Sequence, residues 1–434
     1  MRLLASDAAR LTGGALHGPD LTFDGAGIDT RTVRAGQLFV ALRGARDGHA
    51  FIDAAVAAGA AACLVEHPHG ATTSVVVADT SVALTALATA ARGRLPERVV
   101  GITGSVGKTS TKDLLAAALA RHWRVSASAK SFNNELGVPL TVLGAPDDAE
   151  AVVVEMGARG RGHIAALCAV AQPVVGVVTT VGLSHAEFFG TLDDVVASKG
   201  ELVEALPAHG TAVLNADVAQ VAGMAGRTPA RVLTFGLAAG DVRAESVTLD
   251  DDLRPAFRLR SPWGDAGVTL AVRGHHQVAN ALAAAAAALA CGTPVDAVAA
   301  GLGDARLSPW RMQLEHAPSG ALVLNDTYNA NPLSVEAALR ALAALPGRRR
   351  TAVLGIMAEL GAVGPAEHAR LGALAASLGI RVIAVDAPGY GGEAVSGVPE
   401  ALDRLGPIGA GDAVLIKGSR AAGLESLAGT LATR

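Results

Sequence analysis

The sequence predicts an α/β protein of three domains: a small mixed α/β N-terminal domain, a central P-loop domain built on a parallel sheet, and a C-terminal Rossmann-like domain. Three observations support this. The chain has 434 residues, too many for one ordinary hydrophobic core. Val-rich runs alternate with helical stretches, which is typical of parallel sheets covered on both faces. Breaks in this pattern divide the chain into residues 1–82, 83–308 and 309–434.

The first domain is expected from residues 28–66, where short apolar runs alternate with glycine and polar turns before a small-residue helix and a strand. An alanine-rich helix is expected over residues 82–92. It runs into the sequence Gly-Arg-Leu-Pro-Glu, which is typical of a linker. A compact mixed α/β unit therefore precedes the central domain.

The central and C-terminal domains are expected from two sets of apolar strands with helical stretches between them. In the central set the strands are residues 98–103, 151–158, 173–182 and 211–217. At residues 241–273, apolar residues alternate with polar and turn residues, which indicates a set of antiparallel strands. The helix 276–290 closes that domain. In the C-terminal set the strands are residues 321–328, 350–357, 381–387 and 413–419, which indicate a smaller doubly wound unit.

Composition and charge exclude several classes of protein. The formal net charge is −4, and no basic stripe with interleaved aromatic residues occurs, so nucleic-acid binding has no support. No apolar run is long enough to span a bilayer, and the first residues lack the apolar stretch of a signal peptide. Cys63, Cys168 and Cys291 lie far apart, which suits buried thiols in a reducing compartment. We expect a cytoplasmic monomer without membrane insertion.

The segment from Gly101 to Ser110 reads as strand, glycine-rich loop and helix start, which is the context of a phosphate-binding loop. Its backbone N–H groups and the helix dipole can bind phosphate oxygens, while Lys108 reaches the terminal phosphates and Thr109 holds Mg²⁺. The first glycine is one residue earlier than in the usual pattern. The expected nucleotide-binding residues of the loop are Gly104, Ser105, Val106, Gly107, Lys108, Thr109 and Ser110. The central domain is thus predicted to be an ATPase domain.

Three further residues could complete a metal site. Glu155 ends an apolar strand, so its carboxylate should point toward the phosphates, unless it simply lies in solvent. His185 follows the next strand, although alone it would be a packed or surface histidine. Lys199 lies in an apolar stripe of the helix 192–206. It either reaches out to solvent or serves a site, and the pattern leaves both open.

These residues, in this order, resemble the Mur ligases over essentially the whole chain. The likeness comes from "GITGSVGKTS", "VVVEMGA", "TTVGLSHAEFFGTLDDVVASKGEL", "GHHQVANALAAAA" and "RMQ". Within this family, "FNNELGVP", "NDTYNANPLS", "GIMAELG" and "IKGSRAAGLE" are similar to the ligases that add D-alanyl-D-alanine. The resemblance implies ATP-dependent amide formation between D-alanyl-D-alanine and UDP-N-acetylmuramoyl-tripeptide, through an acyl phosphate.

The resemblance also implies roles for individual residues. Lys199 matches a lysine that becomes N-carbamylated and binds a second Mg²⁺, with His185 as its companion. Thr109 and Glu155 match the ligands of the first Mg²⁺. The expected nucleotide contacts outside the loop are Asn280 to adenine, Arg311 to the phosphates and Asp326 to ribose. The expected substrate residues are Thr30, Arg31, Asn133, Asn134, Asn329 and Asn331.

Several alternatives remain at this point. The asparagines could simply form turns, which suits "YNANP". The chain could instead be the Mur ligase that adds the third amino acid or a folylpolyglutamate-synthase-like ligase, although "YNANP" argues against both. A P-loop ATPase that acts as a switch and forms no bond is the alternative from another class. Nucleotide contacts from two domains imply that these domains close before the chemistry, with a hinge near residues 307–309.

Overall fold

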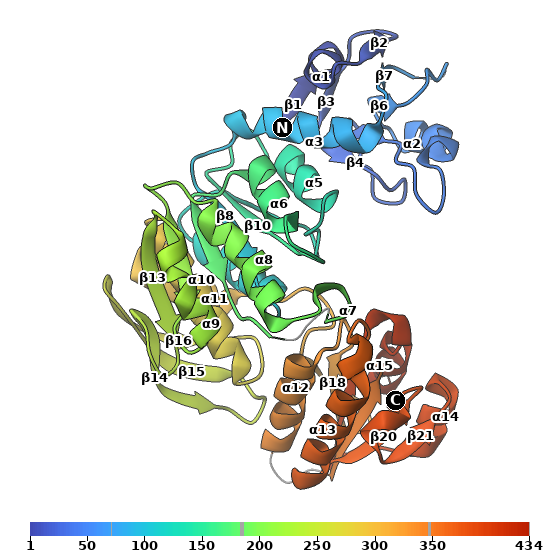
Figure 1. The fold of residues 1–434 in the computed structure, drawn as a ribbon. Coiled ribbons are helices and arrows are strands. Elements are labelled where there is room, and N and C mark those ends of the chain that lie inside the picture. Colours follow the sequence, from blue (N-terminus) through green and yellow to red (C-terminus); the bar gives the residue numbers. More distant parts are fainter. Residues whose placement is uncertain (71, 183–185, 346–348, 434) are drawn as a thin grey trace.

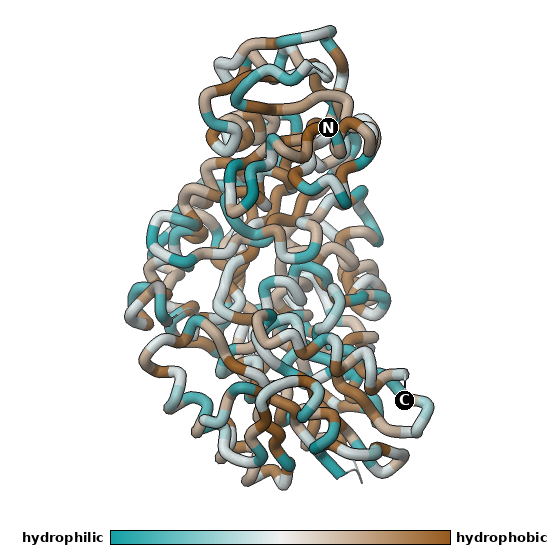
Figure 2. Tube along the Cα trace, turned by 90° about the vertical axis from the view of Figure 1, so that its right-hand side faces the viewer, coloured by the Kyte–Doolittle hydropathy of each residue, from teal (hydrophilic) through white to brown (hydrophobic). Residues whose placement is uncertain are grey.

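The computed structural model describes residues 1–70, 72–182, 186–345 and 349–433. The chain forms three successive parts, with the N terminus in the uppermost part of Figure 1 and the C terminus in the lowermost. Figure 2 gives the same order from the side and shows hydrophobic and hydrophilic stretches alternating along the trace. The predicted three-part α/β architecture is confirmed. Among the described residues, no helix has both the length and the apolar character required to cross a membrane.

The N-terminal part contains a sheet of order β2-β7-β6-β5-β4 and an antiparallel pair formed by β1 and β3. Its elements are β1 Arg2–Leu4, α1 Ala5–Thr12, β2 Ala15–His17, β3 Thr22–Asp24, β4 Ala26–Gly27, β5 Leu38–Val40, α2 Ile52–Ala57, β6 Ala62–Val65, β7 Ser74–Val76 and α3 Thr80–Ala91. Asp79 begins α3 by accepting hydrogen bonds from two backbone N–H groups. The expected division between residues 82 and 83 falls inside this helix, which packs on both α1 and α5.

The central part is built on one sheet of order β16-β15-β14-β13-β12-β11-β8-β10-β9 within the described residues. Its strands are β8 Val99–Thr103, β9 Val125–Ala127, β10 Ala151–Glu155, β11 Val175–Val178, β12 Thr211–Asn215, β13 Arg231–Gly236, β14 Val242–Leu249, β15 Pro255–Ser261 and β16 Gly264–Thr269. Its helices are α4 Lys108–Ala120, α5 Gly137–Gly144, α6 His163–Ala171, α7 Ala186–Phe189, α8 Leu192–Glu204, α9 Ala219–Ala222, α10 His276–Ala290 and α11 Val295–Asp304.

The predicted antiparallel strands are confirmed. β14 pairs antiparallel with β15, and β15 with β16, while the other strand pairs of this sheet are parallel. Strands β9 and β13 were not predicted, and the strand expected at 173–182 is shorter. Helices cover both faces. α4, α10 and α11 pack on one face, where residues 281–288 of α10 are fully buried because alanine lets helix and sheet approach closely. The core of the other face is continuous with that of the N-terminal part.

The C-terminal part is a doubly wound unit with the sheet order β17-β18-β22-β19-β20-β21. Its elements are β17 Gln313–His316, β18 Leu322–Asp326, α12 Pro332–Ala344, β19 Arg349–Gly355, α13 Gly364–Ser377, β20 Arg381–Val385, β21 Glu393–Val395, α14 Val398–Leu405, β22 Asp412–Lys417 and α15 Glu425–Ala432. Helices α12 and α13 bury one face, and α14 and α15 bury the other. The antiparallel strand β17 and the short strand β21 were not predicted.

Candidate active site

A cavity of about 1190 Å³ lies where the central and C-terminal parts meet. It is bordered by the loop before α4, the carboxyl ends of central strands, the start of α10, and the turn that follows β18. Ligands in open parallel sheets gather at such carboxyl ends. The cavity brings together these predicted residues: Ser105, Val106, Gly107, Lys108, Thr109, Ser110, Asn133, Asn134, Glu155, Lys199, Asn280, Arg311, Asp326, Asn329 and Asn331. Segments from four regions of the chain therefore form one site.

Three predicted residues do not line this cavity, and a fourth lies outside the described residues. Gly104 belongs to the phosphate loop but does not line the cavity, and His185 lies outside the described residues. Thr30 and Arg31 lie in the N-terminal part and do not line it either. The Asp29 carboxylate accepts hydrogen bonds from the Arg31 guanidinium, with one N–O distance of 2.6 Å, and the Arg31 side chain is 85% exposed. This contact lowers the pKa of Asp29 to about 2.

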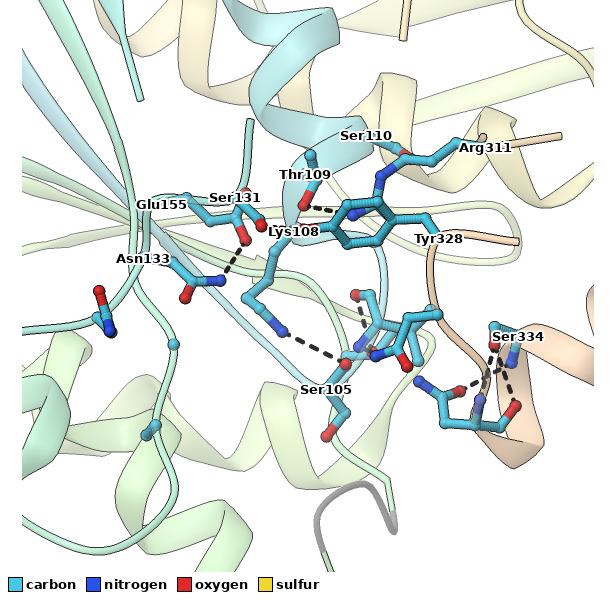
Figure 3. A pocket seen from close by; sticks show the side chains of 18 of the residues that line it. Ser105, Lys108, Thr109, Ser110, Ser131, Asn133, Glu155, Arg311, Tyr328 and Ser334 are labelled. Carbon is cyan, nitrogen blue, oxygen red and sulfur yellow. Dashed lines mark hydrogen bonds between the residues drawn. The ribbon is translucent and has the colours of Figure 1, made fainter. Parts of the chain in front are cut away.

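The loop between β8 and α4 has the geometry of a phosphate cradle. Gly107 has φ +87°, and a Cβ there would lie 2.3 Å from the Asn280 Oδ1, so only glycine fits. The Lys108 ammonium donates to the Gly104 carbonyl at 2.6 Å. A longer contact of 3.4 Å reaches the Ser105 carbonyl (Figure 3). Burial, followed by a smaller effect of the Arg311 cation, lowers the pKa of Lys108, which Glu155 partly offsets. The start of α4 thus directs backbone N–H groups and the Lys108 ammonium toward the same side of the cavity.

Glu155 ends β10 beside the phosphate loop. Its side chain is buried, at 1% exposure, so the alternative of a solvent-exposed glutamate is wrong. Its Oε1 accepts a hydrogen bond of 2.7 Å from the Asn133 side-chain amide (Figure 3), whereas its Oε2 is buried without a hydrogen-bond partner among the described residues. A buried carboxylate oxygen without a partner is costly, and a bound cation would satisfy it. Within the described part of the chain, no three His, Cys, Asp or Glu side chains form a metal cluster.

Lys199 is carried by α8 and is buried, at 1% exposure, so the alternative of a lysine that reaches solvent is wrong. Its Nζ lies 5.5 Å from the centre of the Phe189 ring. Burial, together with a smaller effect of the Lys108 cation, lowers the pKa of Lys199 to about 7, and Glu201 partly opposes both effects. At pH 7 about half of the amine is therefore neutral, the form that a nucleophilic or carbamylated lysine requires.

Arg311 belongs to the C-terminal part, and its side chain extends to the phosphate loop of the central part. Its guanidinium Nη2 donates to the Thr109 hydroxyl at 2.9 Å, and its Cζ lies over the Tyr328 ring, 4.2 Å from the ring centre (Figure 3). The Arg311 Nε is buried without a hydrogen-bond partner among the described residues. The neighbours Trp310 and Met312 have φ of +63° and +48°. This strained segment directs the guanidinium into the cavity.

The predicted asparagines make local hydrogen bonds while they line the cavity. Asn331 caps α12 through the Ser334 N–H, and Asn134 accepts from the Gly137 N–H at 2.9 Å. The Asn329 Oδ1 accepts from the Ala330 N–H at 2.9 Å. These local hydrogen bonds agree with the turn-forming interpretation. Among the described residues, no hydrogen bond uses the amide NH₂ groups of these three asparagines, which could donate to a ligand.

The sequence analysis missed several residues of the cavity, namely Ser131, His276, Gln277, Tyr328 and Lys417. Tyr328 joins the two parts, since its hydroxyl contacts the Ser131 hydroxyl. Lys417 had a visible signal, because a lysine at the end of "AVLIK" is as unusual as Lys199 in its apolar helix. The cysteines offer no alternative chemistry. All three are buried, and burial raises the pKa of each thiol to about 12.

Comparison with known proteins assigns the class of protein. Residues 22–98 match the Mur ligase family catalytic domain, residues 102–288 the Mur ligase middle domain, and residues 310–420 the Mur ligase glutamate ligase domain. The chain belongs to the Mur ligase family.

Within this family, the chain is similar to relatives that share one name. The chain is 42% identical to a UDP-N-acetylmuramoyl-tripeptide--D-alanyl-D-alanine ligase of Mycobacterium tuberculosis, over 93% of this chain and 91% of that protein. It is 36% identical to the Escherichia coli enzyme of the same name, over 97% and 96%. A crystal structure of MurF from Acinetobacter baumannii superposes with a TM-score of 0.89 at 31% identity, over 100% and 99% of the chains. MurF from Thermotoga maritima in complex with ADP has a TM-score of 0.81 at 29% identity, over 94% and 96%.

Proposed function

We propose that this chain is the ligase that joins D-alanyl-D-alanine to the terminal carboxylate of UDP-N-acetylmuramoyl-tripeptide at the expense of ATP, in peptidoglycan precursor synthesis. One observation carries the proposal. A single cavity holds a phosphate loop, a buried Glu155 with one oxygen that has no hydrogen-bond partner among the described residues, a buried Lys199 with a lowered pKa, and an arginine from the C-terminal part. The names of the relatives supply the substrates. Such precursors and ATP place the reaction in the cytoplasm.

The first step activates the terminal carboxylate of the tripeptide, which by itself is a poor acceptor for an amine. A carboxylate oxygen of the tripeptide attacks the γ-phosphorus of ATP, the bond to the β,γ-bridging oxygen breaks, and ADP leaves. The product is an acyl phosphate. Negative charge accumulates between the carboxylate and the phosphates, and we assign Lys108 and Arg311 to neutralise it. The Arg311 guanidinium already reaches Thr109 at the phosphate loop, which fits this role.

Mg²⁺ would be held by Thr109 and Glu155 at a first site and by Lys199 and His185 at a second. The buried Glu155 Oε2, which has no hydrogen-bond partner within the described part of the chain, fits a cation ligand. Mg²⁺, when bound, would polarise the phosphate oxygens. The Lys199 Nζ would add to CO₂, form an N–C bond and lose a proton, and so become an N-carbamate with two oxygen ligands. A lysine whose pKa is lowered to about 7 fits this proposal because only the neutral amine reacts.

The second step forms the amide. The free amine of D-alanyl-D-alanine attacks the acyl carbon, and the tetrahedral intermediate expels phosphate. Water would compete with the amine, so the central and C-terminal parts must close around the acyl phosphate. We assign Asn280 to adenine, Asp326 to ribose, Asn133, Asn134, Asn329 and Asn331 to the two peptide substrates, and Thr30 and Arg31 to the uridine nucleotide. A boundary between the central and C-terminal domains at residues 308–309, a hinge at 307–309 and a monomeric enzyme complete the proposal.

The test is ADP release in the presence of Mg-ATP and UDP-muramoyl tripeptide, with mass spectrometry of the products. D-alanyl-D-alanine should stimulate release and yield one new amide. Lysine, diaminopimelate and glutamate should not. In parallel reactions, stimulation by lysine or diaminopimelate with a muramoyl dipeptide acceptor would support the third-residue ligase, and stimulation by glutamate with a folate acceptor would support a folylpolyglutamate-synthase-like enzyme. ATP hydrolysis without any amide product would contradict every ligase assignment. Parallel reactions with lysine- and diaminopimelate-containing tripeptides identify the preferred acceptor.

A further inference from the structure

Lys417 is a buried cation that the proposed chemistry does not use. It ends β22, and the parallel register places it directly beside Asp326 at the end of β18. Its side chain is 2% exposed and lines the cavity. Burial of an ammonium group costs several kcal/mol unless it is paired and hydrogen-bonded. The partners of Lys417 therefore indicate its purpose.

Both strong hydrogen bonds of Lys417 go to the turn that follows β18. Its Nζ donates to the Asp326 carboxylate Oδ2 and, at 2.9 Å, to the backbone carbonyl of Asn329. A third, longer contact reaches the Asp326 carbonyl at 3.5 Å. One ammonium group thus fixes the carboxylate at the start of the turn and a carbonyl three residues later.

The same turn is attached to the segment that carries Arg311. The second Asp326 oxygen, Oδ1, accepts from the Met312 N–H at 3.1 Å. The Tyr328 N–H donates to the Trp310 carbonyl at 3.2 Å, and the Tyr328 ring stacks on Arg311. A continuous series of contacts therefore leads from Lys417 through the turn to Arg311. Arg311 in turn contacts Thr109 in the phosphate loop.

We propose that Lys417 is a positioning residue that couples the nucleotide half of the cavity to the half that receives the amine substrate. It acts through Asp326 on the nucleotide side and through the Asn329 carbonyl on the other. This inference rests on the proposed function. A purely structural role is a poor explanation, because well-packed apolar residues stabilise a sheet as well as a buried ion pair does.

The perturbation is Lys417→Met, which keeps an unbranched side chain one heavy atom shorter than lysine and removes its charge. Arg349→Met is the matched control. Arg349 pairs with Asp412 at 2.8 Å, at the other end of the same strand, and neither residue lines the cavity. For each protein, the dissociation constant of ADP is measured by titration calorimetry with and without saturating D-alanyl-D-alanine, alongside kcat, both KM values and the thermal unfolding midpoint.

In the wild type we expect D-alanyl-D-alanine to tighten ADP binding, and in Lys417→Met we expect this effect to disappear. The KM for D-alanyl-D-alanine should rise about tenfold or more, since small misplacements near a reacting centre have large effects. Arg349→Met should retain wild-type coupling and KM. A Lys417→Met variant with wild-type coupling and KM values would overturn the inference, as would a wild type without coupling.

Lys417→Arg covers the case in which Lys417→Met does not fold. It keeps the charge, but its planar guanidinium cannot take the same positions as an ammonium group, so we expect reduced coupling in a protein with a near-normal unfolding midpoint. Unchanged coupling in this variant would also overturn the inference. A wild type whose ADP release ignores D-alanyl-D-alanine would contradict the proposed function itself. If ADP release by the wild type depends on D-alanyl-D-alanine but Lys417→Met keeps wild-type coupling and KM values, only the inference is contradicted and the proposed function stands.

Discussion

Replacement of Lys199 should abolish catalysis and at the same time stabilise the folded protein. Burial lowers the pKa of Lys199 from 10.5 to about 7. At pH 7, about half of the amine is then neutral, compared with about one part in three thousand for an ordinary lysine. This roughly thousandfold gain in reactive amine is what carbamylation needs. The same burial disfavours the charged form, so the folded state carries a cost for this lysine.

The sign of the pH dependence follows from the two pKa values. Between pH 7 and about 10.5, the unfolded chain keeps a proton on Lys199 that the folded protein has lost, so stability rises with pH in this window. At about 1.4 kcal/mol per pH unit, the gain from pH 7 to pH 9 is about 2 kcal/mol. Below pH 7 the folded protein also keeps this proton, so the full free-energy cost of burying the charged Lys199 remains, about 5 kcal/mol as an upper limit.

The assay is urea unfolding at pH 7 and pH 9 in CO₂-free buffer, which keeps the amine unmodified. We expect Lys199→Met to be more stable than wild type at pH 7 and to lose the rise toward pH 9. Lys130→Met, at an exposed position, is the control and should keep that rise. Equal pH dependence in wild type and Lys199→Met would refute the assignment of a lowered pKa.

The activity of a second variant tests the carbamate. Loss of a metal ligand worth about 4 kcal/mol of transition-state stabilisation lowers kcat about a thousandfold, so Lys199→Ala should retain about 0.1% of the ADP release rate. Acetate or formate should restore part of the activity by supplying a carboxylate in the vacated space. Full activity without added acid would contradict the carbamate proposal.

Two further substitutions test the geometry of the cavity. Gly107→Ala should weaken ADP binding at least tenfold, because φ is +87° and the new Cβ would meet Asn280 at 2.3 Å. Gly429→Ala, where a Cβ meets open space, should leave the calorimetric affinity unchanged. Tyr328→Phe keeps the ring on Arg311 but removes the hydroxyl that contacts Ser131. A lost hydrogen bond of about 1 kcal/mol predicts about a fivefold rise in the KM for D-alanyl-D-alanine, with no additional effect of Ser131→Ala in the double variant.

The sequence predicted the features that depend on neighbouring residues. The phosphate loop is one continuous segment between a strand and a helix, so its glycines, Lys108 and Thr109 could be recognised without knowledge of the fold. The helix of Lys199 likewise showed its apolar surroundings through the spacing of its neighbours. Strands β9 and β21 were missed, because each is only three residues long and carries little periodic signal.

Contacts between distant segments could not be predicted from local patterns. Arg311 and Thr109 are 202 residues apart, and Lys417 and Asp326 are 91 apart. The sequence suggested that Asn133 binds substrate, whereas its amide also donates to Glu155 and fixes the orientation of that carboxylate. The sequence left open whether Lys199 is buried, and the packing of α8 in the fold answered that question.

The sequence by itself thus determined the class of fold, the phosphate loop and the resemblance to the Mur ligases, because periodicity and contiguous motifs are local properties of the chain. Only the tertiary structure decided which oxygen of Glu155 lacks a hydrogen-bond partner among the described residues, that the pKa of Lys199 falls, and that Lys417 contacts both Asp326 and the Asn329 carbonyl. Each of these depends on desolvation and on charges brought close by folding, and both effects vary with distances that the order of residues does not contain.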